Sequence, residues 1–188
     1  MNAPAAPPAA EPRDVLDFWR EAGPERWFKK DDAFDQAMTD RFLTLHGEAS
    51  AGALDPWSDE ADGSLALILV LDQFSRNIYR GTPQAYAQDP QALALSQEGV
   101  AAGALLDLRE EEERTFLLMP YMHSESRLVH VQAESLFRQF TPPGNHEFEL
   151  RHKAIIDRFA RYPHRNGILG RTSSDAEIEF LRQPGSGF

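Results

Sequence analysis

Hydrophobic residues recur along most of the chain at the three- and four-residue spacing of a helix that buries one side. Phe34, Met38, Phe42 and Leu45 fall on one such face. The stretch 64–79 is apolar on nearly every side, which is typical of a helix at the centre of a fold. No segment alternates with the period of two that a half-buried strand shows. The pattern therefore predicts an all-α protein built around the segment 64–79.

Turn and cap residues divide this pattern into about seven or eight helices. Breaks that contain Gly or Pro at 23–24, 81–83 and 142–144 end helices, whereas the residues at 89–90 and 174–177 have the composition of helix starts. Because the connections are short, we expect neighbouring helices to be antiparallel. The expected helices cover residues 12–22, 31–52, 64–79, 89–103, 110–119, 124–140, 145–162 and 174–182.

Two of these boundaries depend on single residues. Pro120 lacks the amide hydrogen that a helix interior requires, so the helix that begins at residue 110 is expected to end before it. Asn145 follows a firm break and is expected to cap the helix that reaches Tyr162.

The length and the hydrophobic content favour one globular domain. The chain has 188 residues, of which 41% are hydrophobic. We expect a helical domain over 12–182, between a disordered Ala/Pro-rich tail at 1–11 and a flexible tail at 183–188. The first residues lack the basic start and apolar core of a signal peptide, and the longest apolar run, 65–71, is too short to cross a bilayer. A cytoplasmic location without membrane association is expected.

Charge and composition argue against several classes of function. The chain has no cysteine, which excludes disulfides, thiolate metal sites and a cysteine nucleophile. Its net charge of -11 repels nucleic acid and anionic lipid, so neither is an expected partner. Glu149 and His152 have the spacing of a di-iron motif, but that architecture needs two copies and the chain has one. No metal and no cofactor are expected.

Three polar segments contain more Arg, His and Asn than ordinary connections do. The first is LDQFSRNIYRG at 71–81, and the second is MPYMHSES at 119–126. The third is RFARYPHRN at 158–166, followed by GRTSS at 170–174. Each lies near the end of an expected helix, where side chains from different helices can meet on one rim.

Together with Trp27-Phe28, these segments resemble the uncharacterised bacterial family catalogued as domain of unknown function nine-two-four. The resemblance extends from about Asp14 to Leu181. Ser75 stands where the family often has Pro, and Tyr121 and Tyr162 stand where Phe is common. The resemblance implies a fold similar to tetratricopeptide repeats, a compact array of antiparallel helix pairs. It implies no particular activity.

The leading functional prediction is a pocket that binds a small anion or the acidic end of a peptide. An arginine can hold a carboxylate or phosphate through two parallel hydrogen bonds, and the amides that begin the last expected helix suit an anion as well. The alternative is that these residues cap helices and pair with acids of the chain itself. The predicted ligand-binding residues are Arg76, Asn77, Arg127, Arg165, Asn166 and Arg171.

Two other functions remain open. The first is a hydrolase that uses His123, Glu125 and His164 as acid–base groups beside the arginines, because a histidine next to a carboxylate can exchange protons near neutral pH. It requires the three side chains to converge on one space. The second is a protein-interaction scaffold, in which the polar segments are buried fasteners with no cavity beside Arg76 and Arg165.

Overall fold

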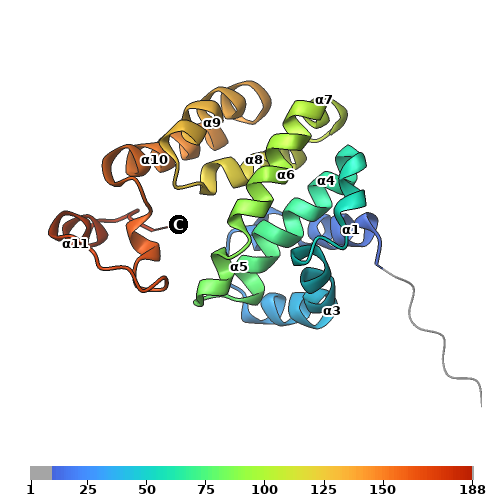
Figure 1. The fold of residues 1–188 in the computed structure, drawn as a ribbon, viewed down its shortest axis with the longest axis horizontal. Helices are drawn as coiled ribbons and strands as arrows, with labels where there is room; N and C mark the ends of the chain where they lie inside the picture. The colour runs from blue at the N-terminus through green and yellow to red at the C-terminus, as the bar shows by residue number, and fades with distance from the viewer. Residues whose placement is uncertain (1–9, 188) are drawn as a thin grey trace, which may run out of the picture.

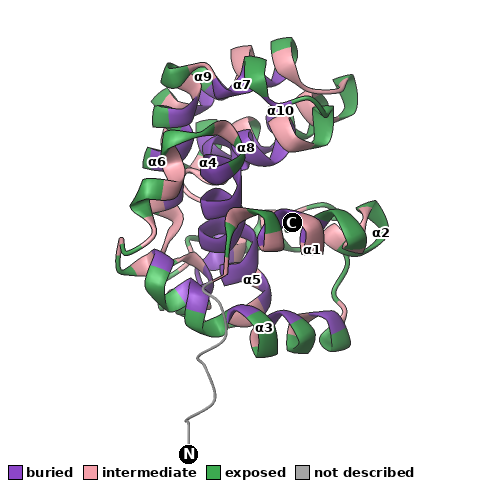
Figure 2. Cartoon of the chain, turned by 90° about the vertical axis from the view of Figure 1, so that its right-hand side faces the viewer, coloured by how far each residue is buried: buried purple, intermediate pink, exposed green. Residues whose placement is uncertain are grey.

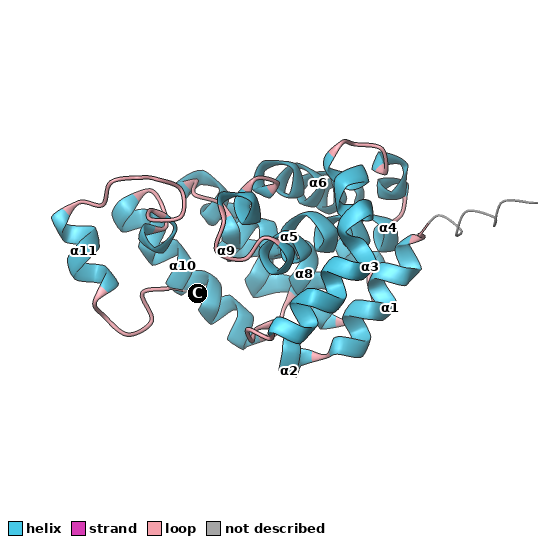
Figure 3. Ribbon diagram, turned by 90° about the horizontal axis from the view of Figure 1, so that it is seen from below, coloured by secondary structure: helices cyan, strands magenta, loops and turns pink. Residues whose placement is uncertain are grey.

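The structure is a computed structural model that describes residues 10–187. Most of the predicted tail at 1–11 lies outside these residues, as does Phe188. Helices and turns make up the described chain, and no strand occurs between residues 10 and 187 (Figure 3). The all-α prediction is confirmed.

The helices follow the predicted order, with several short helical turns between them (Figure 1). The α-helices are α1 Pro12–Ala22, α2 Pro24–Trp27, α3 Asp32–Ser50, α4 Ala61–Ile68, α5 Ser75–Ile78, α6 Asp89–Ala102, α7 Ala104–Asp107, α8 Glu111–His123, α9 Arg127–Phe140, α10 Pro143–Phe159 and α11 Asp175–Leu181. The 3₁₀ turns are η1 Asp55–Asp59, η3 Pro83–Tyr86 and η4 Pro163–Arg165, and η2 Leu69–Phe74 is a π-helical segment.

Two predicted boundaries are wrong. Pro120 lies inside α8, which continues to His123. The proline removes one backbone hydrogen bond, and the burial of residues 115–122 in the core offsets this loss. Helix α10 begins at Pro143, whose fixed backbone suits a first helical position. Asn145 therefore does not cap it, and its side-chain amide instead donates to Thr115 Oγ1 of α8 at 2.9 Å.

The hydrophobic core surrounds the segment predicted to be central. Helices α4 and α5 and the π-helical segment between them form one continuous rod, and residues 65–71 and Phe74 are at most 2% exposed. Helices α1, α3, α6 and α8 pack around this rod, which is the buried column at the centre of Figure 2. Its burial on all sides explains why its sequence shows no polar face.

The π-helical segment changes the direction of side chains within the central rod. A π turn contains an extra residue and shifts every later position around the axis, and such turns are frequent at functional sites. This one covers residues 69–74 and brings the carboxylate of Asp72, which is fully buried, to the end of α8. The first polar segment thus begins inside the core and emerges from it at Arg76.

The later helices form a second group. Helix α9 packs against both α8 and α10, and α11 with η4 lies beyond them at the end of the molecule (Figure 1). Short connections at 124–126 and 141–142 join the three packed helices, in keeping with the predicted antiparallel neighbours. A tetratricopeptide-like repeat remains a prediction. No helix within residues 10–187 combines the length and hydrophobicity needed to cross a bilayer.

Candidate functional site

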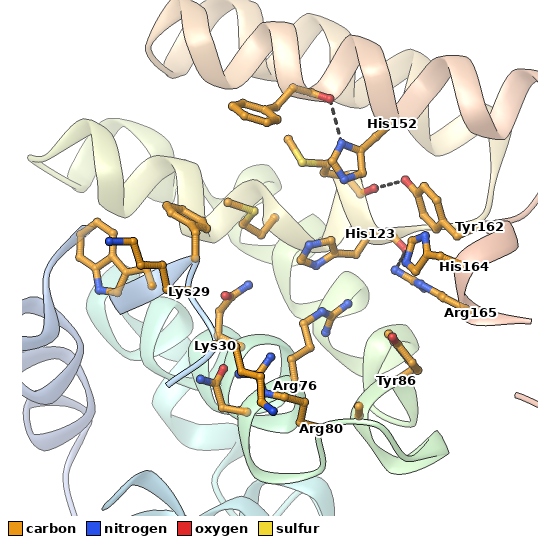
Figure 4. A pocket seen from close by; sticks show the side chains of 18 of the residues that line it. Lys29, Lys30, Arg76, Arg80, Tyr86, His123, His152, Tyr162, His164 and Arg165 are labelled. Atoms are coloured by element: carbon orange, nitrogen blue, oxygen red, sulfur yellow. Dashed lines mark hydrogen bonds between the residues drawn. The ribbon is translucent and has the colours of Figure 1, made fainter. Parts of the chain in front are cut away.

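A pocket of about 510 Å³ lies between the central rod and the later helices. We call it the central pocket. Its lower side comes from the end of the central rod and from η3, and its upper side comes from α8, α10 and η4 (Figure 4). All three polar segments of the sequence contribute to its lining, although they are far apart along the chain.

The lining of the central pocket is cationic. It contains five basic side chains and no acidic one, whereas the chain as a whole has a net charge of -11. Two of the three lysines in the sequence are among them. The basic residues are Lys29, Lys30, Arg76, Arg80 and Arg165. Basic side chains of an acidic protein therefore gather at this cavity, although four of the five also pair with aspartates outside its lining.

An aspartate behind the pocket joins Arg76 to Arg165. Asp89, the first residue of α6, lies 3.0 Å from Nη1 of Arg76 and 3.1 Å from Nη1 of Arg165. Burial and the neighbouring charge of Arg76 lower the pKa of Arg165. The two guanidinium groups thus share the carboxylate of Asp89, and Arg76 also pairs with Asp72, so the two arginines are balanced by two aspartates.

The guanidinium of Arg165 is also held between two aromatic rings. Its Cζ lies 4.7 Å from the ring centroid of Tyr86 and 4.6 Å from that of Tyr162. Its Nη2 donates to the carbonyl of His123 at 3.1 Å, but its buried Nε has no hydrogen-bond partner within residues 10–187. Stacking of this kind fixes the plane of an arginine and leaves edge donors for a ligand.

A second aspartate orients the basic residues at the other side of the pocket. The carboxylate of Asp35 in α3 accepts hydrogen bonds from Arg80 Nε at 2.7 Å and from Asn77 Nδ2 at 2.8 Å. Asn77 lies in α5, the last turn of the central rod, and Arg80 follows the end of that helix. A helix end suits positive side chains, because its free carbonyls carry partial negative charge.

His123 and Asp72 form a hydrogen-bonded pair at the pocket. Nδ1 of His123 lies 2.8 Å from Oδ1 of Asp72, which also contacts Nη1 of Arg76 at 3.0 Å. Burial raises the pKa of Asp72, but the charge of Arg76 and the hydrogen bond from His123 outweigh burial and hold that pKa well below its usual range. Burial, with the charge of Arg76, lowers the pKa of His123. A neutral imidazole that donates from Nδ1 to this carboxylate keeps a lone pair on Nε2.

Two more histidines line the upper side of the pocket. Burial lowers the pKa of His152 to about 3 and that of His164 to about 4. The Nδ1 of His152 donates to the carbonyl of Phe148 at 2.8 Å, one turn earlier in α10. Both rings are therefore neutral near pH 7 and present polar but uncharged surface to the pocket.

The structure brings together only part of the predicted site. Arg76, Asn77, Arg165, His123 and His164 line the central pocket. The other four predicted residues lie outside it and contact the chain itself: Glu125, Arg127, Asn166 and Arg171.

Three of these four residues fasten the loop that follows α10, in what we call the loop network. Arg171 binds both carboxylate oxygens of Glu125, at 2.6 and 3.0 Å, and its Nε donates to Oδ1 of Asn166 at 2.9 Å. Glu125 also accepts the backbone amide of Tyr162 at 2.7 Å. The predicted acid–base role of Glu125 beside His123 is therefore corrected: the carboxylate that meets His123 is Asp72.

Arg127 and the start of α11, both predicted to contact an anion, also form their hydrogen bonds within the chain. Arg127 donates to the carbonyls of Ile156 and Asp157, at 3.3 and 2.9 Å, and so caps the end of α10 instead of facing a ligand. At the start of α11, the Glu177 amide donates to Ser174 Oγ at 3.3 Å, and Arg161 binds Glu177 at 2.6 Å. The predicted anion site at this helix start is occupied by the chain's own side chains.

Several residues that line the pocket or hold its arginines were not predicted as site residues. Lys29 and Lys30 directly follow Trp27-Phe28, which the family resemblance had singled out, so their position carried a signal. Asp72, which pairs with Arg76, belongs to the first polar segment but was not selected. Asp89 and His152 had no signal in the sequence that connects them with the pocket. Among residues 10–187, no group of three or more acidic, histidine or cysteine side chains is gathered as a metal site.

Comparison with known proteins supports the resemblance and leaves the activity open. The chain is similar to a solved structure described as a protein of unknown function, ATU0120 from Agrobacterium tumefaciens. The two share 39% sequence identity with a TM-score of 0.87, over 90% of this chain and 96% of that one. A search of curated proteins found no match. The family described as "Bacterial protein of unknown function (DUF924)" matches residues 15–185, and the chain belongs to this family.

Proposed function

We propose that the protein binds a small anion in the central pocket. One observation carries the proposal: five basic side chains and no acidic one line a cavity in a chain whose net charge is -11. A random distribution of charge would place several of the 30 acidic residues there. Phosphate and carboxylate groups are the ligands that arginine binds best.

The arrangement of the basic residues supports this function. Asp72 and Asp89 hold Arg76, Asp89 also holds Arg165, and Asp35 holds Arg80. These contacts fix the guanidinium groups before a ligand arrives, so little conformational entropy is lost on binding. Lys29, by contrast, forms no ion pair with any of the residues 10–187, and its charge is available to a ligand.

The scaffold alternative fits this arrangement less well. It requires Arg76 and Arg165 to be sealed among protein partners with no cavity beside them. Both side chains are substantially buried and ion-paired, but both line the central pocket. The presence of the cavity favours ligand binding over a purely structural role.

A matched pair of lysine variants tests the proposal. Lys30→Gln removes a pocket charge, and Lys153→Gln removes a charge from α10 outside the pocket. Both lysines pair with a nearby aspartate, so their effects on stability should be similar and below about 0.5 kcal/mol. Thermal unfolding of each variant would be followed with increasing phosphate, acetate and AMP, because a ligand raises the melting temperature of the protein that binds it.

We expect at least one of these anions to raise the melting temperature of the wild type and of Lys153→Gln more than that of Lys30→Gln. Measurement at constant ionic strength separates binding from general screening of the negative chain. Equal shifts in all three proteins would contradict the proposal, as would no shift in any of them.

The pair of Asp72 and His123 favours a second candidate function, the hydrolysis of an ester of the bound anion. Asp72 holds the imidazole through Nδ1, which leaves the basic Nε2 at the pocket. A water molecule there would transfer a proton to Nε2 while its oxygen attacks the ester. The imidazolium would then return the proton to the departing alcohol, and the arginines would bind the negative charge that develops.

Chromogenic esters test this second candidate. Turnover of p-nitrophenyl acetate and p-nitrophenyl phosphate would be compared in the wild type, His123→Gln and Asp72→Asn. General base catalysis predicts that kcat falls about 100-fold or more in His123→Gln. Turnover that is unchanged in His123→Gln, or absent from the wild type with both esters, would contradict this function and leave anion binding unaffected.

A further inference from the structure

The central pocket has an apolar wall as well as basic residues. Trp27 and Phe28 from the α2 turn, Met119 and Met122 from α8, and Phe148 from α10 line it. Two of these rings are unusually open to water for aromatic side chains: Phe28 is 67% exposed and Phe148 is 49% exposed. They come from segments far apart in the sequence, yet they border the same pocket. Exposed apolar rings that gather at one cavity mark a binding surface more often than single exposed rings do.

Contacts with neighbouring residues hold two rings of the wall, Trp27 and Phe28. The indole Nε1 of Trp27 donates to the carbonyl of Trp19 at 2.7 Å, which fixes the ring plane. The ring of Phe28 stacks on Phe116 with a centroid distance of 6.1 Å. Aromatic side chains that are fixed in advance lose little conformational entropy when a ligand covers them. The two methionines on the other side are flexible and polarisable, and they can adapt to the edge of a flat ring.

The volume of the pocket also exceeds what an inorganic ion needs. An oxyanion such as phosphate is only a few times larger than the share of about 30 Å³ that one water molecule takes in the liquid. It would leave most of the 510 Å³ to water and would leave the apolar wall uncovered. Pockets of roughly 300–1,000 Å³ typically enclose organic molecules, whose apolar part fills the cavity while a few polar groups fix the orientation.

We infer that the ligand is an aromatic organic anion. Its acidic group contacts the arginines of the pocket, Arg76, Arg80 and Arg165, and its flat apolar body covers the wall made by Trp27, Phe28 and Phe148. The inference rests on the proposed function, because it names the class of anion that the central pocket binds. Both halves of the ligand are then matched by fixed side chains: stacked or ion-paired guanidinium groups at one side, and packed aromatic rings at the other.

Calorimetric titration with paired probes tests the inference. Phenyl phosphate is compared with inorganic phosphate, and benzoate is compared with acetate. Each pair shares an acidic group and differs by the aromatic body, so the ratio of the two dissociation constants reports the apolar wall alone. Which pair binds more tightly shows whether the acidic group is a phosphate or a carboxylate. In the tighter pair we expect the aromatic probe to bind at least tenfold more strongly, because a covered ring removes apolar surface from water.

A matched pair of variants on α10 locates the effect. Phe148→Ala removes one ring of the wall, and Leu150→Ala removes an apolar side chain of similar exposure on the same helix that does not line the pocket. We expect Phe148→Ala to reduce the tenfold ratio to about threefold or less while the small anion keeps its affinity within twofold. Leu150→Ala should keep the full ratio.

The outcomes separate the two proposals. If aromatic and small anions bind equally well to the wild type, the inference is wrong and the proposed function stands. If Phe148→Ala keeps the full ratio, the aromatic body lies elsewhere and the inference is also wrong. If no probe binds, the proposed function fails and the inference fails with it.

Discussion

The central pocket and the loop network use the same chemistry for different ends. In both, arginines bind carboxylates from distant parts of the chain: Arg165 binds Asp89, and Arg171 binds Glu125. In the loop network, the guanidinium of Arg171 also contacts Asn166 and the carbonyl of Tyr162, and neither Arg171 nor Asn166 lines the pocket. Arg165, by contrast, lines the pocket, although its Nε is buried and has no hydrogen-bond partner within residues 10–187. Residue type and ion pairing are therefore alike in the two regions, and the adjacent empty volume is what distinguishes the pocket.

The two regions are connected through Tyr162. Glu125 of the loop network accepts its backbone amide, while its ring lies 4.6 Å from the guanidinium of Arg165. Its hydroxyl donates to the carbonyl of Met122 at 2.5 Å. The loop network thus supports Tyr162, which lines the pocket, whereas Glu125 and Arg171 do not line it themselves. Three substitutions sharpen this comparison, from the largest expected effect to the smallest. Two change residues of the pocket, and the one in the loop network tests how far the two regions are separate.

Arg76→Ala should give the largest loss of stability. Asp72 is fully buried and Asp89 is mostly buried, and the substitution leaves both without their shared cation. Breaking a buried ion pair from one side costs about 3–5 kcal/mol, which urea unfolding would measure. Arg76→Lys keeps the charge and should recover part of the loss. A change below about 1 kcal/mol in Arg76→Ala would show that this arginine is not a structural element of the pocket.

Arg171→Ala should reduce stability by a smaller amount and leave ligand binding nearly intact. It removes two charged hydrogen bonds to Glu125, which is partly open to water, so we expect a loss of about 2 kcal/mol in the free energy of unfolding. Affinity for the best-binding anion should change less than about threefold, because the hydroxyl of Tyr162 still holds its ring below Arg165. A tenfold or greater loss of affinity would mean that the loop network and the pocket act as one unit.

His152→Gln should change how stability depends on pH. Burial lowers the pKa of His152 to about 3 in the folded protein, while its usual value is 6.5, so the unfolded chain binds a proton between these values and the folded one does not. Neutral His152 makes its full contribution to the free energy of unfolding above pH 6.5, and this contribution is lost as the pH falls toward 3. The loss is about 1.4 kcal/mol for each pH unit, or about 2 kcal/mol between pH 6.5 and 5.

Glutamine keeps a donor for the Phe148 carbonyl but does not titrate, so the variant should lack this part of the pH dependence. Urea unfolding at pH 7, 6 and 5 measures the slope in both proteins. Parallel curves for the wild type and the variant would show that His152 is hydrated in the folded state.

The sequence predicted most of the fold because helix signals are local. The stripe in α3, the apolar segment of the central rod and the capping box of α11 each depend on residues within one or two turns. The errors arose where packing between residues distant in the sequence decides the local helix geometry. Pro120 is buried in the last turn of α8, and the π-helical turn in the central rod has no signature in its apolar sequence.

The candidate site could be predicted only in part. The three polar segments contained Arg76, His123 and Arg165, and all three line the pocket. The same reasoning selected Arg171, six residues after Arg165, although it belongs to the loop network. Lys29 and Lys30 directly follow the Trp27-Phe28 pair of the family resemblance, but they were not selected because two exposed lysines are ordinary in a surface turn. Only their place opposite the arginines gives them a role in the proposal.

The sequence by itself determined that the chain is all-α, where its central helix lies and which segments carry unusual polar chemistry, because these follow from spacing and composition within short stretches. The tertiary structure decided which of the polar groups face a cavity and which are saturated by the chain itself. Asp72 meets His123 across 51 residues, and Arg165 meets Asp89 across 76. Contacts over such separations depend on how whole helices pack, and no local pattern encodes the volume that the packing leaves empty.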